Sequence, residues 1–96
     1  MTTLRMPVHP GEILKHEFLD EMGISAGKLA RHIHVPRTRI ERLVKEETAM
    51  TVDTAQRLSR AFGTSVEFWM NLQLNYDLTR NEPGPDIRNI EPLAAA

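Results

Sequence analysis

The sequence predicts an all-α fold with five helices, the second and third forming a helix-turn-helix, followed by an irregular C-terminal tail. Apolar residues recur at helical spacing in five segments, and no segment shows the strict alternation of an exposed strand. Capping residues and glycines separate these segments. A chain of 96 residues suits one domain with a modest core. We therefore expect the helical domain over residues 1–79 and the tail over residues 80–96.

The first helix is predicted from "HPGEILKHEFLDEMG". Leu14, Phe18 and Met22 are four residues apart, so they are expected on one buried face of a helix. Gly23 follows where a helix can end with a residue of positive φ. Ser25 then predicts the N-terminal cap of the second helix.

The second and third helices are joined only by "HIHVP", close to the 3–4-residue turn of a helix-turn-helix. Pro36 is expected in the first turn of the third helix, where its missing N–H costs little. His34 stands where glycine is usual, because the backbone there often needs positive φ, a conformation that histidine tolerates better than most residues. The apolar residues expected in the core beneath this turn are Leu29, Ile33, Val35, Ile40, Leu43 and Val44.

The last two helices are predicted from caps and apolar stripes. Thr51 opens the fourth helix and Gly63 ends it, with Ala55, Leu58 and Phe62 inward. "TSVE" predicts a capping box, in which the Thr64 hydroxyl and the Glu67 carboxylate satisfy each other's backbone N–H groups. The fifth helix then runs to about residue 78 or 79. Three prolines and weak periodicity predict the irregular tail.

The distribution of charge is more informative than its sum, which is -1. Between Ser25 and Lys45 there are six Lys or Arg against the single carboxylate of Glu41, a local charge of +5. A basic stripe on an acidic body is the electrostatic pattern expected of a DNA-binding protein. The commoner alternative is a charged helix face that only keeps the protein soluble.

A helix-turn-helix places the start of its second helix in the major groove, with the preceding helix across the backbone. The surface of the third helix opposite its core residues therefore predicts base-edge contacts by Arg37, Thr38, Glu41 and Arg42. Glu41 is equally compatible with a solvated ion pair to Arg37 or Lys45. Phosphate contacts are predicted for Ser25, Gly27, Lys28, Arg39 and Lys45. Glu46 and Glu47 follow directly, where approach to the DNA backbone would be repulsive.

Other chemistry finds little support in the sequence. The chain has no cysteine, which suits a reducing cytoplasm and excludes thiolate chemistry. Two histidines spaced two apart, His32 and His34, do not supply the three or four converging ligands of a metal site. No paired acid and base, glycine-rich phosphate loop or long apolar segment is present. We therefore expect a cytoplasmic protein that is not an enzyme, with no cofactor, metal, membrane or small-molecule substrate.

The fifth helix predicts a homodimer. Its apolar residues point almost all round the axis, which indicates burial on more than one side. In so small a chain the second surface is best covered by another copy, and the predicted interface residues are Trp69, Met70, Leu74 and Leu78. A two-fold dimer would place its two recognition helices about one DNA turn apart, roughly 34–36 Å.

The stretches "HPGEILKHEFL" and "TVDTAQRLSRAFGTSVEFWMNLQLNYDL", with a helix-turn-helix between them, resemble the HigA antitoxins among the Xre-like helix-turn-helix proteins. The resemblance spans about residues 7–78 and implies a five-helix lambda-repressor-like domain. It also implies a dimer that represses its own operon and neutralises a HigB-type toxin, a RelE-like ribonuclease that cleaves mRNA. Family members often have an Asn-Gly-Lys-Arg-like turn after the recognition helix, where this chain has "KEET".

The toxin would require a binding surface of its own. Glu17, Asp20 and Glu21 form an acidic stripe on the first helix and could complement a basic, RNA-binding toxin, although the stripe could equally face water. Two further functions stay open from the sequence: an orphan Xre-like transcriptional regulator, or a protein-binding inhibitor with weak DNA affinity.

Overall fold

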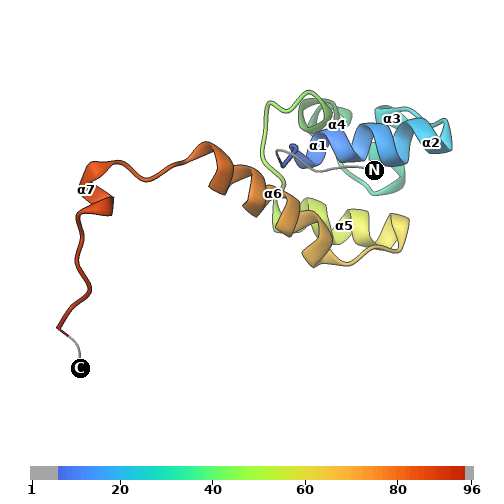
Figure 1. The fold of residues 1–96 in the computed structure, drawn as a ribbon. Coiled ribbons are helices and arrows are strands. Elements are labelled where there is room, and N and C mark those ends of the chain that lie inside the picture. Colours follow the sequence, from blue (N-terminus) through green and yellow to red (C-terminus); the bar gives the residue numbers. More distant parts are fainter. Residues whose placement is uncertain (1–6, 95–96) are drawn as a thin grey trace.

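The computed structural model describes residues 7–94, which are helical without any strand, as the sequence predicts (Figure 1). The first helix runs unbroken through three labelled parts: α1 (Pro10–Ile13), η1 (Leu14–Leu19) and α2 (Asp20–Met22). Four more helices complete the body of the protein: α3 (Ala26–His32), α4 (Arg37–Val44), α5 (Val52–Phe62) and α6 (Val66–Arg80). The tail contains a short helix that the sequence did not predict, α7 (Pro85–Arg88).

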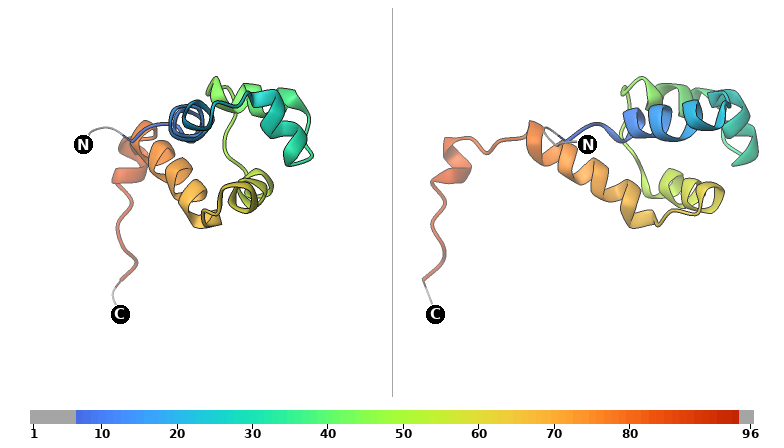
Figure 2. Two further views of the ribbon diagram at one scale, coloured as in Figure 1. Left: turned by 90° about the vertical axis from the view of Figure 1, so that its right-hand side faces the viewer. Right: turned by 45° about the vertical axis from the view of Figure 1, so that its right-hand side comes forward.

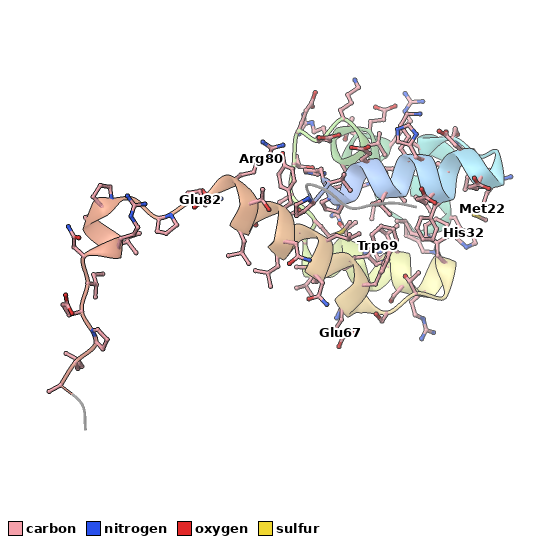
Figure 3. All side chains as sticks on the ribbon, viewed as in Figure 1. Met22, His32, Glu67, Trp69, Arg80 and Glu82 are labelled. Atoms are coloured by element: carbon pink, nitrogen blue, oxygen red, sulfur yellow. The ribbon has the colours of Figure 1, made fainter. Side chains whose placement is uncertain are left out.

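Trp69 of α6 lies at the centre of the core, between α6 and the first helix (Figure 3). Its ring is fully buried, packs 5.1 Å from that of Phe18, and its Nε1 donates to Thr64 Oγ1 at 2.7 Å. The prediction that Trp69 lies between two chains is therefore wrong, because its own chain covers it completely. The other large side chains that are fully buried are Pro10, Leu14, Leu29, Ile40, Leu43 and Leu58.

The first helix buries a different set of residues from the one predicted. Leu14 and Leu19 are buried, Phe18 is half-buried and Met22 is exposed. Residues 14–19 form a π-helix, whose hydrogen bonds span five residues instead of four. The apolar face therefore shifts by one residue after Leu14, and the prediction that Met22 faces the core is wrong.

Most of the predicted helix ends are confirmed. The Ser25 hydroxyl accepts from the Lys28 amide at 3.1 Å, and the Thr51 hydroxyl accepts from the Thr54 amide at 3.2 Å. Gly23 has a φ of 67°, in the left-handed region that favours glycine and ends a helix.

Two caps lie one residue away from the prediction. Ser65, and not Thr64, caps α6, because its hydroxyl accepts from the Phe68 amide at 3.0 Å. The predicted capping box is therefore wrong, and the Thr64 hydroxyl is left to bond the buried indole of Trp69. Pro36 is the cap of α4 and lies just before its first turn.

The "HPGE" segment fixes the first helix against α4 and α6. His9 is buried and caps α1, its Nδ1 accepting from the Gly11 amide at 2.9 Å, while its ring meets the ring of Tyr76 edge-on at 4.9 Å. Gly11 packs against the end of α4 so closely that a Cβ there would lie 1.8 Å from the Leu43 carbonyl oxygen. The absence of a side chain at residue 11 thus sets the distance between the two helices.

Candidate nucleic-acid interface

The turn between α3 and α4 is closed by backbone hydrogen bonds around His34. The Val35 amide donates to the Ala30 carbonyl at 3.0 Å, and the His34 amide donates to the Arg31 carbonyl at 3.3 Å. This is the Schellman arrangement of a helix end, which needs a left-handed residue. His34 supplies it with a φ of 63°, so the predicted positive φ at this histidine is confirmed.

The helix α4 has a buried side and a basic side. Ile40 and Leu43 are buried in the core. At 3.6 residues per turn, the residues on the opposite side are Thr38, Arg42 and Lys45, all of them exposed. These three side chains occupy the middle of the outward face of α4.

Arg37 lies at one flank of this face, beside α3. Its Nε is 3.2 Å from Glu41 Oε2, so Glu41 forms the ion pair that the sequence left as an alternative to base contact. The Arg37 side chain also passes over Gly27, where an added Cβ would be 3.0 Å from Arg37 Cδ. The first turn of α3 and the first turn of α4 therefore share one surface.

The residues of α3 and its cap that are predicted to contact phosphates lie on that shared surface. Ser25 and Lys28 are exposed and Gly27 is half-buried. The Ser25 hydroxyl already accepts from the Lys28 amide within its own helix. The Lys28 ammonium is thus the group here that is best suited to meet a phosphate.

Arg39 lies at the other flank of α4 and is held by α5. Its Nη1 is 2.5 Å from Asp53 Oδ2 and 3.5 Å from Thr54 Oγ1. Arg57 Nε donates to the same Asp53 oxygen at 3.0 Å, and Arg57 Nη1 donates to the Ile33 carbonyl at 2.8 Å. Asp53 and Arg57 therefore connect α5 both to α4 and to the helix-turn-helix turn, and Arg39 is a structural partner of α5 as well as a phosphate candidate.

The hydrogen bond from Arg57, followed by that from Arg39, lowers the pKa of Asp53 below its ordinary value of 3.8. The carboxylate therefore stays ionised to a lower pH than that of an isolated aspartate. Sequence reasoning missed this cluster because its members lie on separate helices, and the only local signal is the four-residue spacing of Asp53 and Arg57.

A groove of about 700 Å³ runs along α4 where it faces the start of α5. Charged and hydroxyl side chains from both helices and from the intervening loop line it. The lining residues are Thr38, Arg39, Arg42, Thr48, Ala49, Thr51, Asp53, Thr54 and Arg57. The hydroxyls of the α4–α5 loop are therefore additional candidate contacts that the sequence analysis did not name.

The loop after α4 begins with a second left-handed residue, Glu46, whose φ is 64°. The Glu47 amide donates to the Arg42 carbonyl and the Glu46 amide to the Leu43 carbonyl, both at 2.9 Å. This is again the Schellman arrangement, formed here without glycine. Both glutamates are exposed directly beside Lys45, so they add negative charge at the end of the basic face.

The outer side of α6 carries the remaining residues of the predicted dimer interface. Leu74 and Leu78 are more than half exposed, and Met70 is half-buried. Their spacing of four residues places them on one side of the helix. This outer apolar strip (Met70, Leu74, Leu78) lies away from the buried Trp69.

The acidic residues Glu17, Asp20 and Glu21 of the first helix are exposed. Asp20 Oδ1 forms a local ion pair with Lys15 Nζ at 3.5 Å, and Asp20 Oδ2 lies 3.3 Å from His16 Nδ1. Glu17 lies about one turn before Asp20, and Glu21 directly follows it on the same helix. The structure thus places the predicted toxin-binding stripe on an element separate from α3 and α4.

Within residues 7–94, no three potential metal-ligating side chains converge. In the same part of the chain, no helix combines the length and apolar character needed to span a membrane.

Comparison with known proteins identifies the family. Residues 16–69 match the family model described as Helix-turn-helix. The chain is 39% identical over 93 residues to antitoxin HigA-1 of Vibrio cholerae, covering 95% of this chain and 88% of that protein. It is 46% identical over 83 residues to virulence-associated protein I of Dichelobacter nodosus, covering 86% of this chain and 77% of that protein.

Solved structures agree with this assignment. The Pseudomonas aeruginosa antitoxin HigA with the higBA promoter is 45% identical, with a TM-score of 0.80 over 92% of this chain and 99% of that one. The antitoxin GraA in complex with its operator is 38% identical, with a TM-score of 0.84 over 99% of both chains. The chain therefore belongs to the helix-turn-helix family and, within it, to the HigA-type antitoxins.

Proposed function

We propose that this protein is an antitoxin that binds operator DNA as a dimer, represses its own operon, and neutralises a HigB/RelE-like toxin. The observation that carries the DNA-binding part is the outward face of α4. It presents Thr38, Arg42 and Lys45 on the side opposite the buried Ile40 and Leu43. None of these three exposed side chains fills a place in the core, so their arrangement is free to serve a ligand.

The two solved relatives with DNA support this part of the proposal, because one contains the higBA promoter and the other its operator. In this chain, the Arg42 guanidinium suits the O6 and N7 of a guanine, and Thr38 suits a thymine methyl or a polar base edge. Lys45, at the C-terminal end of this face, and Lys28 of α3 suit phosphates. Arg37 reaches the same surface while it is paired with Glu41.

Dimerisation is proposed through the outer apolar strip of α6. Exposed leucines at residues 74 and 78 have no partner within the described chain that buries them. A two-fold pairing of this strip would give two recognition helices, each reading one half of a palindromic operator. Toxin binding is proposed for the acidic stripe Glu17, Asp20 and Glu21, which stays exposed on the first helix.

The DNA-binding proposal is tested with Arg42→Ala, measured as operator affinity by fluorescence anisotropy at physiological salt. A forked arginine–guanine contact contributes roughly 1–3 kcal/mol, so losing two per dimer should weaken binding at least about 30-fold. Arg60→Ala is the matched control, because Arg60 is also an exposed arginine but lies on α5 near His32 and Ala61.

We expect Arg60→Ala to keep wild-type affinity, and both variants to keep the wild-type melting temperature. Wild-type operator affinity in a folded, dimeric Arg42→Ala protein would show that the basic face of α4 is only solvated. The protein-binding inhibitor would then be the better description.

A further inference from the structure

The C-terminal arm, residues 81–94, extends away from the helical body and does not return to it (Figures 1 and 2). It makes the molecule 54 Å long but only 28 × 23 Å across. The radius of gyration is 16.7 Å, whereas a compact chain of this length would have about 12 Å. The arm therefore makes no contribution to the core of its own chain.

The arm nevertheless carries three large apolar side chains. Ile87, Ile90 and Leu93 are 57%, 72% and 94% exposed. Ile87 lies on α7 and Ile90 lies two residues after its end, and the Ile90 amide donates to the Ile87 carbonyl at 3.0 Å, which keeps these two residues close together. Leu93 follows at the same spacing. An exposed row of large apolar side chains, here Ile87, Ile90 and Leu93, is typical of a segment that packs against another surface.

The arm is also stiffer than an ordinary tail. Pro83, Pro85 and Pro92 fix the backbone φ at three of its fourteen positions. The amides of Ile87, Arg88 and Ile90 all donate to carbonyls of the arm itself. A four-residue helix such as α7 is not stable alone in water, but prolines reduce the entropy lost when the segment docks.

We propose that the arm crosses to a second copy of this chain and packs beside that copy's α6, so that each protomer of the dimer clasps the other. The proposal rests on the α6 dimer proposed above, and it identifies the arm as the second part of that dimer interface. A stable interface buries about 800 Å² on each partner, from roughly 20–30 residues. The outer apolar strip of α6 supplies only three of them, on a helix about 22 Å long.

The arm supplies what the strip lacks. It begins where α6 ends, and Glu82 lies just beyond Arg80 at the end of that helix (Figure 3). The apolar row therefore follows the outer apolar strip along the chain. Ten extended residues and the four residues of α7 can together span up to about 39 Å, which exceeds the 28 Å second dimension of the molecule. The arm has three carboxylates against one arginine, so its charge of -2 disfavours DNA as the covering surface.

The first experiment changes the apolar row to serine, as Ile87→Ser, Ile90→Ser and Leu93→Ser in one chain. Sedimentation equilibrium should show the dimer dissociation constant raised at least 100-fold, with an unchanged circular dichroism spectrum. The matched control changes three exposed polar residues of the same arm to serine, as Glu82→Ser, Asn89→Ser and Glu91→Ser. This control should dimerise like the wild type.

The second experiment uses the absence of cysteine from the chain. Ile90→Cys introduces a single thiol, whose labelling by a maleimide reports its exposure. Labelling should be at least 10-fold slower in the dimer than in the same protein carrying Leu74→Glu, which places a charge in the middle of the outer apolar strip. Equal labelling rates in the dimer and the monomer would overturn the proposal, because the arm would then be uncovered in both.

The outcomes separate this inference from the dimer itself. A wild-type protein that is monomeric at tens of micromolar would contradict both the α6 dimer and the clasping arm. If the Leu74→Glu protein is monomeric and the triple serine variant is fully dimeric, the α6 dimer stands and only the clasping arm is contradicted. A serine variant that stays dimeric but no longer neutralises toxin would also overturn it, because the arm would then serve the toxin.

Discussion

Replacing Gly11 by alanine should destabilise the protein by forcing the first helix away from α4. A Cβ at this position would lie 1.8 Å from the Leu43 carbonyl oxygen and 2.7 Å from its carbonyl carbon. Both atoms belong to the backbone, so no side chain can rotate to make room. The two helices would have to separate by more than 1 Å, in a core that is close-packed.

Insertion of a methyl group into a packed core typically costs about 1–3 kcal/mol. Because the obstacle is backbone, we expect a loss of about 3 kcal/mol in the free energy of unfolding. For a domain of this size, that lowers the melting temperature by about 12–24 °C. Circular dichroism, recorded during thermal unfolding, measures this change in melting temperature. Operator affinity should fall as well, since Leu43 belongs to α4 and the helix would be displaced.

Gly27→Ala is the control for this prediction. The new methyl would meet only side-chain atoms, the nearest of them Arg37 Cδ at 3.0 Å, and that exposed side chain can move. Alanine is also favoured over glycine within a helix by roughly 0.5–1 kcal/mol, so the melting temperature should stay or rise. If Gly11→Ala melts within 2 °C of the wild type, the close packing of "HPGE" on α4 is not a source of stability.

Two further predictions concern charge. The lowered pKa of Asp53 means that its ion pairs stabilise the fold above the ordinary pKa of 3.8 and are lost as the pH falls through the lower folded-state value. The melting-temperature difference between wild type and Asp53→Asn should therefore be present at pH 6 and shrink below pH 4; a difference independent of pH would contradict the ion-pair account. Changing Glu17, Asp20 and Glu21 together to lysine should abolish protection from the toxin in a growth assay while leaving operator affinity intact, and unchanged protection would assign toxin binding to another surface.

Much of the fold could be predicted because its signals are local. Ser25, Thr51 and Gly63 mark helix ends through bonds and dihedral angles within a few residues, and all three are confirmed. The same holds for the short turn of the helix-turn-helix. His34 adopts the positive φ that the geometry of such a turn requires, although histidine is not its usual occupant.

The errors arose where tertiary packing decides the outcome. Periodicity alone placed Met22 in the core, and it could not anticipate the π-helical stretch that shifts the register before it. The apolar character of α6 was visible, but it could not separate Trp69, which fills the core, from Leu74 and Leu78, which remain exposed.

The residues of the candidate site were predicted from the sequence, but the contacts that hold its helices and loops in place were not. The outward positions of Thr38 and Arg42 follow from helical spacing once Ile40 and Leu43 are assigned to the core. The hydrogen bond from the Met50 amide to Gln73 Oε1, at 2.6 Å, ties the loop after α4 to α6 across 23 residues. Side-chain contacts over such separations leave no pattern in the sequence.

Methylation interference on the operator tests the central claim most directly, because methyl groups on guanine N7 block contact in the major groove. A dimer that reads DNA with α4 predicts interfering guanines in two clusters, centred about 10–10.5 base pairs apart on one face of the duplex. Arg42→Ala, bound at higher protein concentration, should lose interference at one guanine of each cluster. A single cluster, or an interference pattern that Arg42→Ala leaves unchanged, would contradict the account.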